Sequence, residues 1–181
     1  MSEIKSILVD ESSPLFQKKG MFHKKFSSDF RQIRYYTLVV MQKAPPEIKE
    51  INLLEQQISE LIKNAVKHGN KKDPGKIVDV WYAFDQSSAR LIVKDEGKGF
   101  QRLEAWNEFN RRRTECFLRQ DFEAMAEFVS FLTPDSDEYD SGNALFAAVE
   151  YWNGGVVFNR ARNAVAVAKY FPQRRHGIEL A

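Results

Sequence analysis

The ten residues from Glu60 to Gly69, ELIKNAVKHG, are the stretch on which the interpretation of this chain depends. Asn64 follows Glu60 by four residues, and Lys67 and His68 follow Asn64 by three and four. On a helix, all four side chains therefore project from one face. An amide oxygen near a carboxylate suits Mg²⁺, which binds a few protein oxygens together with water and phosphates. Taken alone, the stretch also fits an ordinary polar helix face that ends at a glycine cap.

This stretch closes a helix that we predict over about residues 47–68. Its apolar side chains recur at helical spacing; they are Ile51, Leu54, Ile58, Leu61, Ile62 and Ala65. Lysines gather around His68 at its C-terminal end, namely Lys63, Lys67, Lys71, Lys72 and Lys76. This cluster fits either a solvated helix end or a site for a phosphate-bearing ligand.

A strand hairpin is predicted next, over residues 76–84 and 89–95, because apolar side chains alternate along both segments. The hairpin ends in DEGKGF, which begins at Asp95. Gly97 and Gly99 let the backbone approach a flat ligand closely. Asp95, at a strand end, can accept a hydrogen bond from an exocyclic amine such as that of adenine. A plain glycine-rich turn is the alternative.

The remaining elements complete an α+β fold. We predict a short strand over residues 4–9, helices over 27–41 and 142–152, and strands over 155–160 and 164–171. Helices come first and mostly antiparallel strands dominate later. The expected architecture is therefore a two-layer sandwich, with helices on one face of a mixed, mostly antiparallel sheet.

The segment 101–140 differs from its surroundings in charge. It contains 5 basic and 10 acidic side chains, whereas the whole chain has a net charge of +2. Apolar residues at helical spacing predict an amphipathic helix in it; they are Leu118, Phe122, Met125, Val129 and Leu132. An open acidic loop is expected to follow over 133–137.

Length and composition limit the class of protein. The 181 residues fit one domain with a substantial core, and a hydrophobic fraction of 43% argues against disorder. The sequence shows no transmembrane run, no signal peptide and a lone Cys116. We therefore expect a soluble cytoplasmic protein, with neither membrane nor nucleic acid as a direct partner.

The order of these motifs resembles the GHKL (Bergerat-fold) ATPases: Glu-x-x-x-Asn-Ala-x-x-His-Gly, a hairpin ending in Asp-x-Gly-x-Gly-Phe, an insertion, then a glycine before a helix. Within these, the chain is most similar to the bacterial anti-sigma-factor serine/threonine kinases, over about residues 21–171. The resemblance implies an N-terminal extension (1–20), an ATP-binding domain (21–172) whose ATP lid is residues 101–140, and a tail (173–181).

The resemblance also assigns roles to residues. Asn64 would ligate Mg²⁺, and Glu60 would be the general base for the attacking hydroxyl. Asp95 would bind the adenine amine of ATP, with Gly97 and Gly99 shaping the adenine pocket. Further residues are placed near the phosphates or in the second glycine box: Lys67, His68, Gly142, Asn143 and Leu145.

The chain departs from the family pattern at the phosphate end. Ala144 stands where the family often has the second glycine of Gly-x-Gly-Leu, and it adds a methyl group where backbone must pass close to phosphate. Arg162-Asn163-Ala164 replaces a Gly-Thr pair, so that a usual hydroxyl is missing. These changes make nucleotide binding a firmer expectation than catalysis.

Two functions are therefore carried forward. The first is a regulatory serine/threonine kinase that binds a sigma factor and phosphorylates a serine of a STAS-type antagonist, with ATP and Mg²⁺, as a homodimer. The alternative is a nucleotide-gated protein-binding module without phosphotransfer activity. A histidine kinase catalytic domain is less consistent, because His23 lies outside any predicted helical hairpin.

Overall fold

The computed structural model describes residues 5–132 and 143–172 of the chain. The strands are β1 (Leu8–Val9), β2 (Phe22–Ser27), β3 (Ile77–Phe84), β4 (Ser88–Lys94), β5 (Val156–Phe158) and β6 (Ala164–Tyr170). The α-helices are α1 (Ile33–Met41), α2 (Ile51–Asn64), α3 (Leu103–Leu118), α4 (Phe122–Met125) and α5 (Ala144–Tyr151). Short 3₁₀ segments are η1 (Pro14–Phe16), η2 (Phe30–Gln32) and η4 (Ala126–Phe128), and η3 (Ala65–Gly69) is a π-helical turn.

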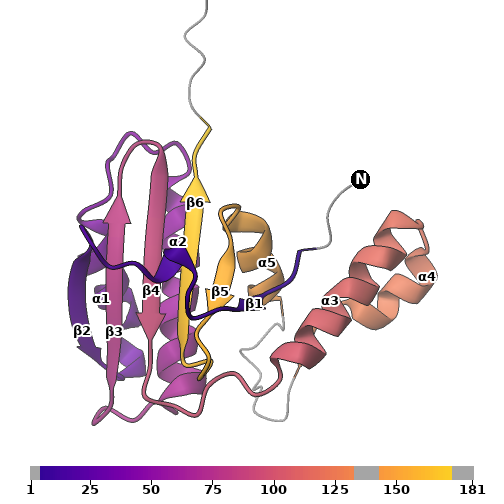
Figure 1. The fold of residues 1–181 in the computed structure, drawn as a ribbon, viewed down its shortest axis with the longest axis horizontal. Helices are drawn as coiled ribbons and strands as arrows, with labels where there is room; N and C mark the ends of the chain where they lie inside the picture. The colour runs from indigo at the N-terminus through magenta and orange to yellow at the C-terminus, as the bar shows by residue number, and fades with distance from the viewer. Residues whose placement is uncertain (1–4, 133–142, 173–181) are drawn as a thin grey trace, which may run out of the picture.

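These strands form one sheet in the order β1-β5-β6-β4-β3-β2. The β1–β5 pair is parallel and the other four pairs are antiparallel. Helices α1, α2 and α5 lie behind the sheet in Figure 1. The predicted α+β sandwich with a mixed, mostly antiparallel sheet is confirmed, and so is the β3–β4 hairpin.

Alternation along β4 explains why α2 packs where it does. Leu91 and Val93 are at most 2% exposed and share one buried core with Leu54 and Ile58 of α2, which contacts β4. Burial of each such side chain contributes about 1.5–3 kcal/mol. This packing fixes α2 on the sheet, which matters because α2 carries Glu60 and Asn64.

The N-terminal segment crosses the opposite face of the sheet, where η1 lies over β4 and β6 (Figure 1). Arg90 Nη2 donates to the carbonyl of Gln17 at 2.8 Å, and Ala166 and Ala168 are fully buried beneath the segment. The part of this segment around η1 therefore packs on the sheet, and β1 extends the edge of the sheet. The predicted boundaries of the extension, domain and tail stay predictions, and the tail 173–181 lies outside the described residues.

Two sequence predictions near the N-terminus were incomplete. Strand β2 was not predicted, because Lys24 and Lys25 interrupt the apolar alternation of an edge strand that is exposed over residues 22–25. The helix predicted from Ser27 begins later, at η2. There Asp29 Oδ1 accepts from the Arg31 amide at 3.0 Å.

The single amphipathic helix predicted from Leu118 to Leu132 was wrong. Helix α3 ends at Leu118, and Gln120 adopts a left-handed backbone with φ of 57°. Asp121 Oδ1 then accepts from the Ala124 amide at 3.0 Å and caps α4. The hydrophobic spacing persisted across the turn, and so it could not reveal the break. The acidic loop predicted over 133–137 lies outside the described residues.

Helix α3 is joined to the N-terminal segment by side-chain amides. Asn107 Nδ2 donates to the carbonyl of Ile7, and Asn107 Oδ1 accepts from the Ile7 amide, both at 2.9 Å. Asn110 Nδ2 donates to the carbonyl of Lys5 at 2.7 Å. On the other side, fully buried Trp106 packs on Phe146 of α5, with ring centroids 5.2 Å apart. The first part of the predicted lid is thus anchored at both sides.

Substitution of Asn107 by Ala should loosen this anchor. Loss of both bonds leaves the half-buried Ile7 amide and carbonyl without partners, and the free energy of unfolding should fall by about 1–2 kcal/mol. Urea unfolding measures the change. Arg112→Ala is the matched control, because it removes an exposed α3 ion pair and should cost at most about 0.5 kcal/mol. Equal effects of the two variants would contradict the anchor.

Candidate functional site

The end of α2 departs from α-helical geometry. The turn η3 is π-helical, and it closes with the Asn70 amide donating to the carbonyl of Ala65 at 2.8 Å. Such turns often lie at functional sites. Because a π-helical turn contains more residues than an α-helical one, Lys67 and His68 depart from the α-helical offsets that the sequence spacing implied. Lys67 is buried and His68 is half-buried.

Glu60 and Asn64 lie in the last two turns of α2, as predicted from their spacing. Both side chains are partly accessible. Lys63 Nζ donates to the Glu60 carboxylate at 2.7 Å, so the predicted general base already has a cationic partner on the same helix. This pairing is an ordinary i,i+3 contact, although Lys63 was predicted only as one of the lysines around His68.

Asp95 follows β4 and is fixed by its backbone neighbours. Its amide donates to the carbonyl of Asn163, and its Oδ1 accepts from the Gly97 amide at 2.7 Å. Among residues 5–132 and 143–172, no hydrogen-bond donor contacts Oδ2. Burial raises the pKa of Asp95 from 3.8 to about 6, against smaller opposing effects of the Gly97 amide and Lys76.

Glycines allow the end of α2 to touch the loop after β4. A Cβ on Gly69 would lie 2.3 Å from Asp95 Cγ, and one on Gly97 would lie 2.2 Å from the carbonyl oxygen of Gly69. Gly99 has φ of 82°, and a Cβ there would lie 2.1 Å from the carbonyl oxygen of Ala161. The close approaches at Gly97 and Gly99 are thus made by the protein's own backbone, whereas the sequence motif predicted the approach of a ligand there.

Two residues were underestimated from the sequence. Gly69 and Asn70 were interpreted only as a helix cap. In the structure, Gly69 contacts Asp95, and Asn70 is fully buried with its side chain hydrogen-bonded to three other segments. An asparagine directly after the cap glycine was the available signal, but its partners are distant in sequence.

The phosphate end is described only in part. Asn143 precedes α5 and is exposed, and Leu145 is half-buried against the core, whereas Gly142 lies outside the described residues. Where the sequence lacks the family's hydroxyl, Asn163 instead forms a side-chain pair with Asn159. Asn159 Nδ2 donates to Asn163 Oδ1 at 2.9 Å, and Asn159 Oδ1 accepts from the Asn163 amide at 3.0 Å.

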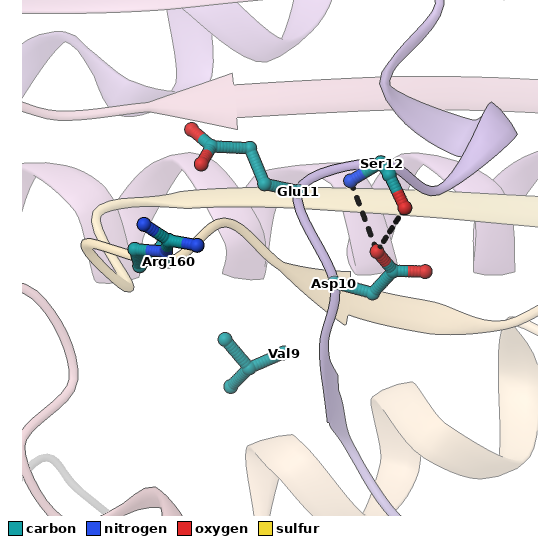
Figure 2. Close-up of a pocket in the computed structure, with 5 residues that line it drawn as sticks. All are labelled: Val9, Asp10, Glu11, Ser12 and Arg160. Atoms are coloured by element: carbon teal, nitrogen blue, oxygen red, sulfur yellow. Dashed lines mark hydrogen bonds between the residues drawn. The ribbon is translucent and has the colours of Figure 1, made fainter.

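A separate cavity of about 480 Å³ lies between the N-terminal segment and the β5–β6 turn. Figure 2 shows the side chains that line it, Val9, Asp10, Glu11, Ser12 and Arg160. The Ser12 amide and hydroxyl both donate to Asp10 Oδ1, at 2.9 and 2.6 Å. None of the predicted site residues lines this cavity, so it is distinct from the site around Asp95.

Two further findings concern ions and membranes. Within the described ranges, no group of three or more His, Cys, Asp or Glu side chains is arranged to hold a metal ion. Across those same ranges, no helix has the length and apolar character needed to cross a bilayer.

Comparison with known proteins identifies the class. The sequence model of the family described as "Histidine kinase-like ATPase domain" matches residues 27–121, from the last residue of β2 to the residue before α4. This match covers more than half of the chain. The chain therefore belongs to the histidine kinase-like ATPase family, the GHKL superfamily predicted from the motifs, and ATP binding follows from that membership.

Curated relatives narrow the resemblance to one branch. The chain is 29% identical to the anti-sigma F factor of Anoxybacillus flavithermus over 59 residues. It is 32% identical over 59 residues to the anti-sigma F factors of a Geobacillus strain and of Geobacillus thermodenitrificans. The matched segment covers 33% of this chain and 40% of each relative. The predicted similarity to the anti-sigma-factor members of the family is confirmed. The chain matches only 40% of the length of these relatives.

The raised pKa of Asp95 predicts how stability varies with pH. The folded protein holds this proton more tightly than the unfolded chain, whose Asp95 has a pKa near 3.8. The free energy of unfolding should therefore fall as pH rises from about 4 to about 6, and stay lower above that. Because Asp95→Asn cannot titrate, it should gain about 1–2 kcal/mol relative to the parent chain between pH about 4.5 and about 7.5.

Urea unfolding of both proteins without nucleotide, at these two pH values, measures the difference. Asp10→Asn, which removes an exposed carboxylate of the N-terminal segment, is the control. A difference between parent and Asp95→Asn that stays constant with pH would contradict the buried carboxylate.

Proposed function

We propose that the chain binds ATP where η3 meets the loop after β4, and that it acts as a regulatory serine/threonine kinase of the anti-sigma-factor type. One observation carries the nucleotide site. The Asp95 carboxylate is half-buried, one oxygen is held by the Gly97 amide, and the other has no donor within the described ranges. The exocyclic amine of adenine would supply that donor.

The residues around Asp95 suit this ligand. An ionised carboxylate away from water is costly unless it is hydrogen-bonded, and the raised pKa of Asp95 reflects that cost. Gly69 and Gly97 place backbone, with no side chain, beside the carboxylate. A flat base that reaches Oδ2 would offset the cost with a hydrogen bond.

Asn64, the last residue of α2, would provide the protein ligand for Mg²⁺. A magnesium ion bound with ATP commonly keeps several waters and phosphate oxygens and needs only one or two protein oxygens. When bound, it would neutralise charge on the phosphates. We place Lys67, His68, Gly142, Asn143 and Leu145 near the phosphates on the basis of the family pattern, and residues 101–140 as the lid over them.

Glu60 would act as general base in phosphoryl transfer. The hydroxyl oxygen of a partner serine would attack the γ-phosphorus of ATP, the bond to the β–γ bridging oxygen would break, and ADP would leave. The hydroxyl proton would pass to the Glu60 carboxylate. Since Lys63 Nζ lies 2.7 Å from this carboxylate, the serine hydroxyl must replace or share that contact.

The partners we propose are a sigma factor and a STAS-type antagonist that carries the serine, with the kinase acting as a homodimer in the cytoplasm. The anti-sigma F factors that match the chain support the first partner by their name. A nucleotide-gated binding module without phosphotransfer is the second candidate. Ala144 at the start of α5 and the Glu60–Lys63 pair favour it, because both bear on the phosphate end.

Asp95→Asn should weaken ATP binding. The amide group replaces a carboxylate acceptor by a poorer, partly mismatched one, which should cost about 1–3 kcal/mol of binding free energy. Isothermal titration with ATP and Mg²⁺ measures this cost. Asp79→Asn on β3, where Asp79 pairs with His23, is a control that should leave affinity unchanged. Parental affinity in Asp95→Asn would remove Asp95 from the pocket, and no binding by the parent would refute the ATP site.

Glu60→Gln separates the kinase from the binding module. ATP affinity should stay within about threefold, because Glu60 is outside the adenine pocket, while transfer to the partner serine falls at least about 10²-fold. Radiolabelled ATP and a STAS-type protein provide the assay. Glu55→Gln on the same helix is the matched control and should transfer phosphate normally.

Equal transfer by parent and Glu60→Gln would exclude Glu60 as the base. Undetectable transfer by a parent chain that still binds ATP would favour the nucleotide-gated module.

A further inference from the structure

Asn70 is a fully buried polar side chain next to the proposed nucleotide site, and its bonds join three segments. Its Nδ2 donates to Ser28 Oγ at 2.7 Å and to the carbonyl of Ile77 at 2.9 Å. Its Oδ1 accepts from the Glu96 amide at 2.8 Å. The side chain thus connects the end of η3 to the end of β2, the start of β3 and the loop after β4.

The orientation of the Asn70 amide is fixed by these partners. Only the oxygen can accept from the Glu96 amide, and only the nitrogen can donate to the Ile77 carbonyl. Both hydrogens of Nδ2 are used, and the relative exposure of the residue is 0%. No other side chain of this length offers two donors and an acceptor in one plane, so the site is specific for asparagine.

The Glu96 amide is the point where this network reaches Asp95. Glu96 lies between Asp95 and Gly97, whose amide donates to Asp95 Oδ1 at 2.7 Å. Consecutive amides of the loop are therefore held by Asn70 and by Asp95 itself. The Glu96 side chain also accepts from the Ile77 amide, so the loop is joined to β3 directly as well as through Asn70.

We propose that Asn70 is a positioning residue of the nucleotide site: it holds the loop from Asp95 to Gly97 against the end of α2, so that the Asp95 carboxylate faces the adenine amine. This role deepens the proposed function and rests on it. Asn70 makes no contact with the nucleotide in this proposal and acts through Asp95 alone.

Asn70→Ala should weaken ATP binding by about tenfold or more, since the freed Glu96 amide lets the loop depart from the productive position. If Asn70 acts through Asp95, its loss should matter little once Asp95 is changed. The double variant Asn70→Ala/Asp95→Asn should then bind ATP within about threefold of the weaker single variant, whereas independent effects would multiply. A merely structural role would lower the free energy of unfolding and leave the ATP affinity of the folded protein unchanged.

Asn153 provides a matched control. Its Nδ2 donates to the carbonyl of Tyr170 at 3.0 Å and its Oδ1 accepts from the Tyr170 amide at 2.8 Å, the same kind of amide bridge. Tyr170 pairs with Ser88, at the opposite end of β4 from Asp95. Asn153→Ala should therefore cost stability without changing ATP affinity.

Amide hydrogen exchange without nucleotide tests the loop directly. In Asn70→Ala, the amides of Glu96 and Gly97 should exchange at least about tenfold faster than in the parent, while that of Leu91 in β4 stays protected. Asn70→Asp is the second variant, in case Asn70→Ala does not fold. It keeps an acceptor for the Glu96 amide, and the protection of that amide should stay within about threefold of the parent.

The outcomes separate the two proposals. Parental ATP affinity in a folded Asn70→Ala would overturn the positioning role alone, as would unchanged protection of Glu96 and Gly97. Multiplied losses in the double variant would overturn action through Asp95. No ATP binding by the parent chain would overturn the proposed function and the positioning role with it.

Discussion

The contact between Gly69 and the carboxylate of Asp95 is the constraint on which the site depends. It brings the end of the long helix α2 against the end of the central strand β4, with no room for a Cβ on Gly69. Partial burial of this carboxylate raises its pKa to about 6. Partial burial of the Asp95 carboxylate against backbone has a free-energy cost. Functional sites often retain groups that carry such a cost.

Other features of the fold keep this contact in place. The packing of α2 against β4, with Ile58 in the shared core, sets the position of α2, and the π-helical turn η3 lets its end reach the loop. Asn70 then ties that loop to β2 and β3. The edge strand β2, which carries little apolar pattern of its own, contributes Ser28 just beyond its end and so belongs to the support of the site.

The insertion and the N-terminal segment form a second unit beside this site. Asn107 and Asn110 of α3 bond to the backbone of residues 5–7, and Arg162 in the β5–β6 turn forms an ion pair with Glu104. The turn in turn contacts the loop after β4, where the Asp95 amide donates to Asn163. A movement of α3 in the proposed lid would therefore change its contacts with the N-terminal segment and with the β5–β6 turn, which bonds to Asp95.

The fold class, the β3–β4 hairpin, the extent of α2 to within a few residues and the family could all be predicted from the amino-acid sequence. It also brought Asn64 and Asp95 forward as candidates, since helical and strand periodicity and the order of motifs are local properties of the chain. Three features became visible only in the folded chain: β2 is a strand, the insertion turns at Gln120, and Gly69 and Asn70 lie beside Asp95 or its loop. These depend on partners far apart in sequence, whose contacts and burial no local pattern specifies.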